Sequence, residues 1–188
     1  LMPINEVIRI GKAVSSALDY AHRQGIIHRD IKPSNILIAK DGRVLLGDFG
    51  MALDVRDGSM GNIFGTPHYI SPEQARRSAD AVPQSDLYSL GVILYEILTG
   101  TVPFNDPSPA SIALQHITEP PPSPRGINPE LSVDVEKVIL KVLEKDPQNR
   151  YQSGAKLMAA IENALKPGNA AKISLPPLPV GVPTVRRS

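Results

Sequence analysis

Two charged residues, Asp30 and Lys32, stand two apart in a loop that Pro33 keeps from becoming helical. In extended backbone, side chains two positions apart point the same way, so the carboxylate and the ammonium can act on one ligand. The carboxylate can orient a hydroxyl and accept its proton, and the ammonium can stabilise a transferring phosphate. The pattern therefore indicates group-transfer chemistry, although a solvated loop with a local ion pair contains the same residue types.

A second polar pair, Asn35 and Asp48, flanks a predicted β-hairpin. Residues 36–38 and 44–46 are apolar, and the Asp-Gly pair at 41–42 is a turn signal. A two-residue turn centred on this pair places Asn35 directly opposite Asp48, with Cβ atoms roughly 5 Å apart. Amide and carboxylate oxygens suit Mg²⁺, so the hairpin predicts a magnesium site beside Asp30. Taken singly, both are also ordinary turn residues.

Helices must position these groups. Apolar residues recur every three or four over residues 5–24, and Gly25 can end that helix in the left-handed conformation. Residues 85–98 are apolar in nearly every direction around a helix axis, which predicts a buried helix at the centre of the domain. Three further helices are expected over residues 110–117, 132–145 and 153–165. The expected N-caps are Ser85, Ser132 and Ser153.

Composition narrows the class of protein. The chain has 188 residues with 41% hydrophobic and 21% charged residues, typical of one soluble domain. The formal net charge is only +1, so no nucleic-acid partner is expected. No cysteine is present, which fits a reducing compartment and predicts a cytoplasmic location.

Two regions differ in composition. Residues 1–166 contain all the acidic residues and form the predicted folded unit, whereas residues 167–188 carry five prolines and no acid, which predicts a basic linker or tail without ordered structure. The longest apolar run, residues 90–95, is shorter than the about 18 residues that a membrane span requires. No membrane span is therefore expected in this chain.

Six motifs, in this order, resemble those of the bacterial type of Ser/Thr protein kinase. The catalytic loop of that family is similar to the first and its metal-binding motif to the second. The third resembles the segment that receives the substrate residue after the phosphoacceptor. In chain order the six are residues 28–35 (HRDIKPSN), 48–50 (DFG), 65–70 (GTPHYI), 71–73 (SPE), 86–91 (DLYSLG) and 146–150 (DPQNR).

The resemblance implies a role for each matching residue. Asp30 is the catalytic base or hydroxyl orienter, and Lys32 contacts the transferring phosphate. Asn35 and Asp48 hold Mg²⁺ beside ATP, and Thr66 closes a hydrogen-bonded set with Asp30 and Lys32. The substrate class implied is a protein with a Ser or Thr acceptor.

Other matching residues are implied to be structural. His28 packs beneath the metal-binding motif, and Asp86 ties the backbone of the catalytic loop to the central helix. Glu73 and Arg150 form a buried ion pair.

Two residues are implied to be regulatory. In the family, the arginine at the position of Arg29 recognises a phosphate added to the activation segment. Most hydroxyls between Asp48 and Glu73 belong to fixed motifs, so Ser59 is the expected phosphoacceptor.

The fold implied is the large lobe of a protein kinase, mainly α-helical with a short β-hairpin next to the catalytic loop. The small β-rich lobe is expected to be absent, because too few residues precede His28 and Lys12 lies in a helix rather than on a strand. Since ATP is gripped between two lobes, this chain is expected to be inactive alone and to need a small lobe from a missing N-terminal segment.

Two other hypotheses stay open. In one, the chain is a non-catalytic module that binds a partner through the kinase-lobe groove. In the other, it is a different ATP-using enzyme on another scaffold. Intact Asp30, Asn35 and Asp48 favour the kinase over the scaffold, and the motif order favours it over the other enzyme.

Overall fold

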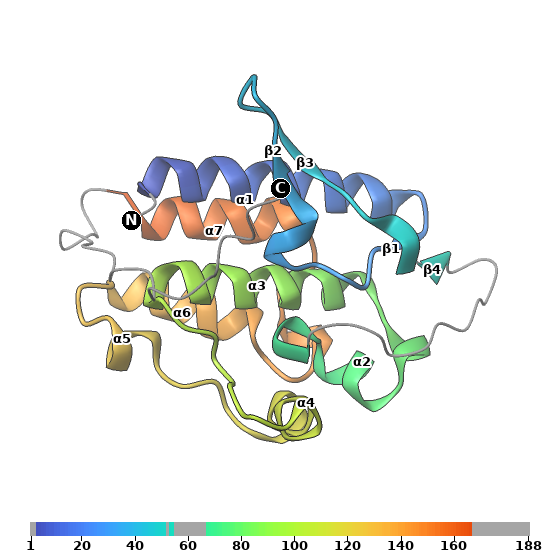
Figure 1. The fold of residues 1–188 in the computed structure, drawn as a ribbon. Coiled ribbons are helices and arrows are strands. Elements are labelled where there is room, and N and C mark those ends of the chain that lie inside the picture. The colour runs from blue at the N-terminus through green and yellow to red at the C-terminus, as the bar shows by residue number, and fades with distance from the viewer. Residues whose placement is uncertain (1–2, 52, 55–66, 167–188) are drawn as a thin grey trace, which may run out of the picture.

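Helix α3 (Pro83–Thr99) lies at the centre of the fold, with other helices packed around it (Figure 1). The computed structural model describes residues 3–51, 53–54 and 67–166. Thirteen of the 17 residues of α3 are buried, including polar Asp86 and Ser89. Gly100 follows with a φ of 81°, a left-handed conformation that ends the helix. The prediction of a buried central helix is confirmed.

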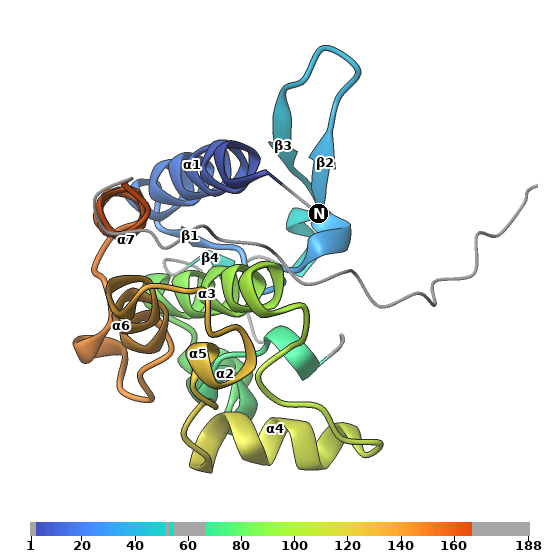
Figure 2. The same cartoon turned by 90° about the vertical axis from the view of Figure 1, so that its left-hand side faces the viewer.

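The remaining helices form layers on both sides of α3. Helices α1 and α7 lie side by side above it, and α6 packs against both α3 and α7 (Figures 1 and 2). Their α-helical bounds are Ile4–Arg23 (α1), Pro72–Arg76 (α2), Pro109–Thr118 (α4), Pro124–Ile127 (α5), Val133–Val142 (α6) and Gly154–Ala164 (α7). Short 3₁₀ turns cover Pro33–Asn35, Phe49–Met51, Pro67–Tyr69, Ser78–Asp80 and Pro147–Asn149. The mainly helical fold class is confirmed.

Two of the three predicted serine N-caps are confirmed. The hydroxyls of Ser132 and Ser153 accept hydrogen bonds from the backbone in the first turns of α6 and α7. The prediction for Ser85 is wrong, because Pro83 starts α3 earlier and makes Val82 the N-cap residue. Ser85 Oγ instead accepts from Val82 N at 2.9 Å and donates to Glu73 Oε1 at 2.5 Å.

Two short antiparallel strand pairs lie at one edge of the helices. Strand β1 (Ile26–Ile27) pairs with β4 (Leu53–Asp54), and β2 (Ile36–Ile38) forms a hairpin with β3 (Val44–Leu46). The hairpin projects from the helices beside α1 (Figure 2).

The predicted hairpin register is wrong by one residue. Ile36 pairs with Leu46, and Ile38 pairs with Val44. Asn35 therefore lies opposite Gly47 and not opposite Asp48. The Gly47 N–H donates to the Asn35 carbonyl at 2.9 Å. The turn holds three residues instead of two, because its last residue, Gly42, adopts a φ of 85°.

Gly91 allows α3 and α6 to approach closely. A Cβ atom at this position would lie 2.4 Å from Val142 Cγ1, well inside van der Waals contact. Gly91→Ala is therefore expected to lower the free energy of unfolding by about 1–3 kcal/mol, measured by urea denaturation. Gly126→Ala is the matched control, because its nearest neighbour would be Ser123 Cβ at 3.6 Å. Equal stability of Gly91→Ala and wild type would contradict the close contact.

Among the described residues, no helix is both long enough and apolar enough to span a membrane.

Candidate catalytic site

The loop between β1 and β2 brings three of the predicted site residues together. Lys32 Nζ lies 2.7 Å from Asp30 Oδ2. Asn35 Nδ2 donates to the Asp30 backbone oxygen at 2.8 Å and to Asp30 Oδ2 at 3.1 Å. The Asp30 side chain is 13% exposed, so its carboxylate is held in place by two partners yet still reaches the surface. This arrangement can present a carboxylate to an incoming hydroxyl.

Asp86 on the central helix holds the backbone of this loop. Its carboxylate accepts hydrogen bonds from His28 N at 2.9 Å and from Arg29 N at 2.8 Å. Arg29 has a φ of 67°, which is uncommon for a residue with a side chain. Two charge-assisted hydrogen bonds to a fully buried carboxylate stabilise that conformation. The conformation of the loop therefore depends on the packing of α3.

His28 links the loop to the segment that carries Asp48. Its Nε2 donates to the Gly47 carbonyl at 2.9 Å, because a carbonyl can only accept. Nδ1 then accepts from Asp30 N at 3.3 Å. The imidazole also contacts the Phe49 ring, with centroids 4.5 Å apart. His28 thus bridges the backbones on which Asp30 and Asp48 stand.

Asn35 and Asp48 offer the oxygen atoms that a magnesium ion requires. Both N–H groups of the Asn35 amide are used by Asp30, which leaves Oδ1 for a ligand. Asp48 is exposed, has a φ of 58°, and its Oδ1 accepts a long 3.3 Å hydrogen bond from Gly50 N. The donor set fits Mg²⁺, which takes few protein ligands and fills the rest of its shell with phosphate and water.

The other predicted site residues are distributed differently. The guanidinium of Arg29 lies 3.5 Å from Ser78 Oγ, and partial burial lowers its pKa more than nearby Asp86 raises it. Thr66 and Ser59 lie outside the described residues. Their predicted roles, and that of Arg29 in recognising phosphate, remain predictions.

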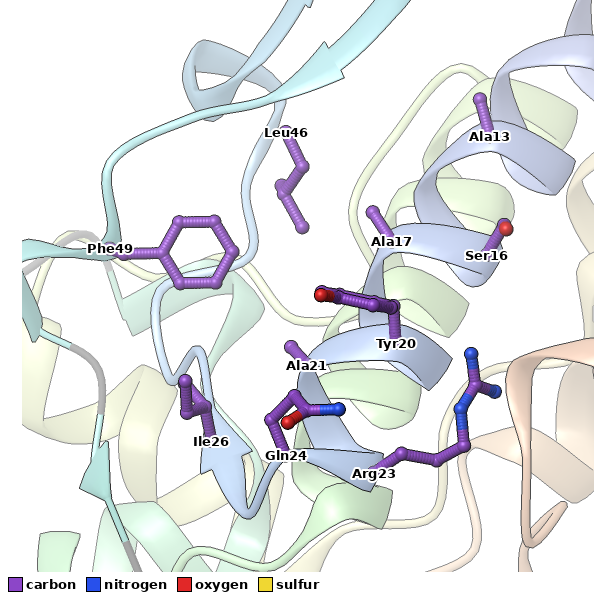
Figure 3. Close-up of a pocket in the computed structure, with 10 residues that line it drawn as sticks. All are labelled: Ala13, Ser16, Ala17, Tyr20, Ala21, Arg23, Gln24, Ile26, Leu46 and Phe49. Carbon is purple, nitrogen blue, oxygen red and sulfur yellow. The ribbon is translucent and has the colours of Figure 1, made fainter.

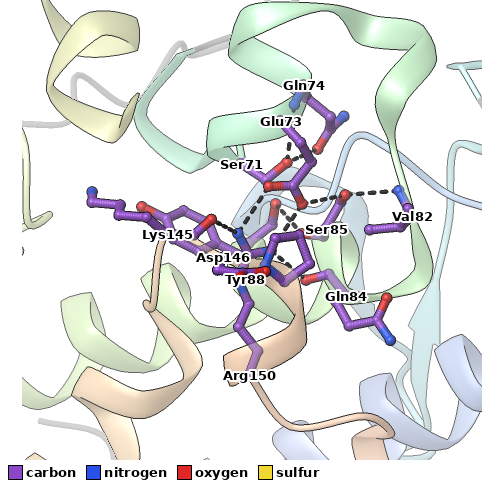
Figure 4. A network of polar contacts seen from close by, with 12 residues as sticks. Ser71, Glu73, Gln74, Val82, Gln84, Ser85, Tyr88, Lys145, Asp146 and Arg150 are labelled. Atoms are coloured by element: carbon purple, nitrogen blue, oxygen red, sulfur yellow. Dashed lines mark hydrogen bonds and ion pairs between the residues drawn. The ribbon is translucent and has the colours of Figure 1, made fainter. Parts of the chain in front are cut away.

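Glu73 of α2 and Arg150 form a two-pronged ion pair in the interior (Figure 4). Nη1 and Nη2 of Arg150 each donate to one Glu73 carboxylate oxygen at 2.8 Å, and both side chains are buried. The same guanidinium lies 4.7 Å from the centroid of the Tyr88 ring. It also donates to three backbone carbonyls, those of Gln84, Glu144 and Lys145. The pair therefore fastens α2 and α3 to the segment before α7.

Because of this ion pair, we expect the fold to lose stability in acid. Burial raises the pKa of Glu73, but the hydrogen bonds and charge of Arg150 outweigh it, so the pKa lies below its ordinary value. A carboxyl with a lowered folded pKa stabilises the fold above its unfolded pKa and loses that contribution as the pH falls through the folded value. We expect the free energy of unfolding to fall as the pH drops below about 4.3.

Urea denaturation at a series of pH values measures this dependence. Glu73→Gln is expected to flatten the acid limb, whereas Asp134→Asn, at an exposed surface pair with Lys137, is expected to leave it unchanged. An identical acid limb in wild type and Glu73→Gln would contradict the assignment.

Sequence reasoning missed two residues that support the loop. His22 Nε2 lies 2.7 Å from Asp86 Oδ2, and Gln74 Nε2 donates to the Arg29 carbonyl at 2.9 Å. His22 falls four residues after buried Leu18 on α1, a position that signals an inward-facing imidazole. Gln74 carries no comparable signal, because its partner lies far away in the chain.

A groove of about 560 Å³ opens between α1 and the segment that carries Phe49 (Figure 3). Alanines of α1 form one wall, and Leu46 and Phe49 lie across from them. Tyr20 is 63% exposed and Phe49 43% exposed, which is unusual for large rings. Leu37 and Leu45, a directly opposed pair on the hairpin, are also exposed. This part of the lobe thus displays apolar side chains to solvent.

Comparison with known proteins agrees with the motifs. The family model described as "Protein kinase domain" matches residues 1–163. "Serine/threonine-protein kinase PknB" of Mycobacterium leprae is 46% identical over 163 residues, which cover 84% of this chain and 26% of the relative.

Two further relatives are also bacterial serine/threonine-protein kinases by name. The protein of the same name from Mycobacterium tuberculosis is 48% identical over 151 residues, covering 76% of this chain and 24% of the relative. "Probable serine/threonine-protein kinase CPE1738" of Clostridium perfringens is 42% identical over 171 residues, which cover 89% of this chain and 25% of the relative. The chain spans about a quarter of the length of the curated relatives it matches.

Proposed function

Since the chain belongs to the protein kinase family, with bacterial Ser/Thr kinases among its relatives, we propose that it transfers the γ-phosphate of ATP to Ser or Thr hydroxyls of proteins. The observation that carries this proposal is the contact of Lys32 and Asn35 with the Asp30 carboxylate. A carboxylate fixed beside a cation and an amide can receive a hydroxyl proton while the cation stabilises phosphate charge.

Each side chain has one task in the proposed reaction. Asp30 orients the acceptor hydroxyl and takes its proton on a carboxylate oxygen. Lys32 places its ammonium on an oxygen of the transferring phosphoryl group. Asn35 and Asp48 are the residues that would hold Mg²⁺, which supplies charge neutralisation to the phosphates. Segment 65–70 receives the substrate residue that follows the acceptor.

A small lobe is the proposed partner of the exposed apolar surface. Leu46 packs toward α1 from one face of the hairpin. Because side chains alternate along strands, Leu37 and Leu45 lie on the opposite face. Exposed apolar side chains on that face favour a docking site. A small lobe resting there would enclose ATP against the hairpin, as the two-lobed architecture of the family requires.

The test compares the 188-residue chain with a longer chain that also carries an upstream small lobe. With Mg-ATP and a basic protein substrate, we expect no phosphoryl transfer by the 188-residue chain and clear transfer by the longer one. Radiolabelled phosphate in the substrate is the measurement. Transfer by the 188-residue chain would contradict the need for a small lobe. Inactivity of both would instead favour a non-catalytic module that binds partners through the same surface.

A further inference from the structure

His116 of α4 makes two hydrogen bonds that connect three separate parts of the lobe. Its Nδ1 lies 2.9 Å from the Tyr88 hydroxyl on α3, and its Nε2 lies 3.0 Å from the backbone oxygen of His68 in the Pro67–Tyr69 turn. The side chain is fully buried. The imidazole is therefore a polar bridge in the interior of the lobe.

The partners fix the protonation of the ring. A carbonyl oxygen can only accept, so Nε2 carries the hydrogen and donates to His68. Nδ1 is then the acceptor, and Tyr88 donates its hydroxyl hydrogen. Burial, aided by the charge of Lys145, lowers the pKa of His116 to about 3. The imidazole is therefore a neutral Nε2–H tautomer at physiological pH.

Two aromatic rings contact the imidazole. The Phe104 ring meets it edge-on with centroids 4.9 Å apart, and the Tyr88 ring does so at 5.6 Å. Lys145 Nζ donates to the His116 carbonyl at 2.8 Å and lies 4.8 Å from the Phe104 centroid. This lysine caps the last turn of α4 and holds the backbone from which the imidazole projects.

The turn that His116 contacts is held by further side chains. His68 Nε2 lies 3.3 Å from Asn105 Oδ1, in the loop between α3 and α4. Two more contacts come from α3. Ser89 Oγ donates to the Tyr69 carbonyl at 2.6 Å, and the Tyr69 hydroxyl donates to Glu96 Oε2 at 2.7 Å. His116 supplies the link to α4. The imidazole of His116 therefore holds the backbone carbonyl of His68, whereas the central helix holds the carbonyl of Tyr69.

We propose that His116 is a positioning residue for protein-substrate binding, acting through the carbonyl of His68 on the segment that receives the residue after the acceptor. The inference rests on the proposed function, because it assumes that a polypeptide docks on residues 67–70. His116 touches neither the substrate nor the reacting atoms. Its effect is to hold one wall of the substrate site at a fixed distance from α4.

Two substitutions separate this role from simple core packing. His116→Leu keeps an apolar body and removes both hydrogen bonds, whereas His116→Gln keeps an N–H donor close to the position of Nε2. Tyr88→Phe is the matched control, because it removes the other hydrogen bond and leaves the His68 contact in place. Thermal unfolding of all three variants reports the loss of stability that they share.

Amide hydrogen exchange in the 188-residue chain is the first readout. His116→Leu is expected to speed exchange in residues 68–71 by about tenfold relative to α3, as the loss of a hydrogen bond worth about 1.4 kcal/mol predicts. His116→Gln is expected to restore most of the protection, and Tyr88→Phe to keep it. Equal exchange in His116→Leu and Tyr88→Phe would overturn the proposal.

Kinetics in the longer chain that carries a small lobe is the second readout. For a basic protein substrate that the wild type phosphorylates, His116→Leu is expected to raise KM about tenfold while kcat and the KM for ATP change less than twofold. A fall in kcat with no change in the protein KM would also overturn the proposal. A wild type without any transferase activity would count against the proposed function alone, because hydrogen exchange still decides whether His116 holds the turn.

Discussion

Replacing Asp30 by Asn is expected to slow phosphoryl transfer by about a hundredfold to ten-thousandfold, the contribution typical of a positioned general base. The amide has the shape of the carboxylate but cannot take a proton from the acceptor hydroxyl. It also loses the negative charge that Lys32 Nζ faces at 2.7 Å. The measurement is the initial rate of substrate phosphorylation at saturating ATP, in the chain that carries a small lobe.

The control for this variant is another aspartate of the same lobe. Asp41 lies in the hairpin turn, is largely exposed and pairs with neighbouring Arg43. Asp41→Asn is expected to leave the rate unchanged, and both variants are expected to unfold at nearly the wild-type temperature. Activity of Asp30→Asn within tenfold of wild type would remove Asp30 from the role of base and leave it as an anchor for Asn35.

Local sequence patterns predicted the strands of the hairpin but not their register. Apolar runs on either side of an Asp-Gly pair correctly placed two strands, yet the register differs by one residue. An Asp-Gly pair fits a two-residue turn and the end of a three-residue turn equally well, since Gly42 supplies the positive φ in both. Asp48 therefore lies one residue beyond the pairing position of Asn35. The geometric argument for the magnesium site is therefore wrong, and the site stays a prediction that rests on the two oxygen donors.

Helices were predictable because their signals are local. An all-round apolar pattern in residues 85–98 depends only on neighbours, and it correctly predicted the central helix. The polar contacts of that helix are long-range. Asp86 meets His22 and the 28–29 backbone, and Tyr88 meets His116, across many intervening residues. Only the tertiary fold decides which polar groups meet, so a buried histidine can be suspected from its position while its partners cannot.

Glu73→Gln is expected to lower the free energy of unfolding by about 3–5 kcal/mol, because it leaves the buried Arg150 guanidinium without a counter-charge. Both side chains are nearly inaccessible to solvent, so water cannot replace the lost partner. Urea denaturation at neutral pH is the measurement. A loss below about 1 kcal/mol, the range of surface pairs, would contradict a buried ion pair.

Arg150→Met is expected to destabilise the fold more than Glu73→Gln does. It leaves a buried carboxylate and also removes the donor to the carbonyls of Gln84, Glu144 and Lys145. The double variant removes both charges, so its loss should be smaller than the sum of the two single losses. Additive losses would mean that the two residues act independently, and α2 would then be held by Ser85 and packing instead of by charge. A strong coupling would show that the ion pair itself fastens α2, the helix that begins at Pro72, shortly after the Pro67–Tyr69 turn.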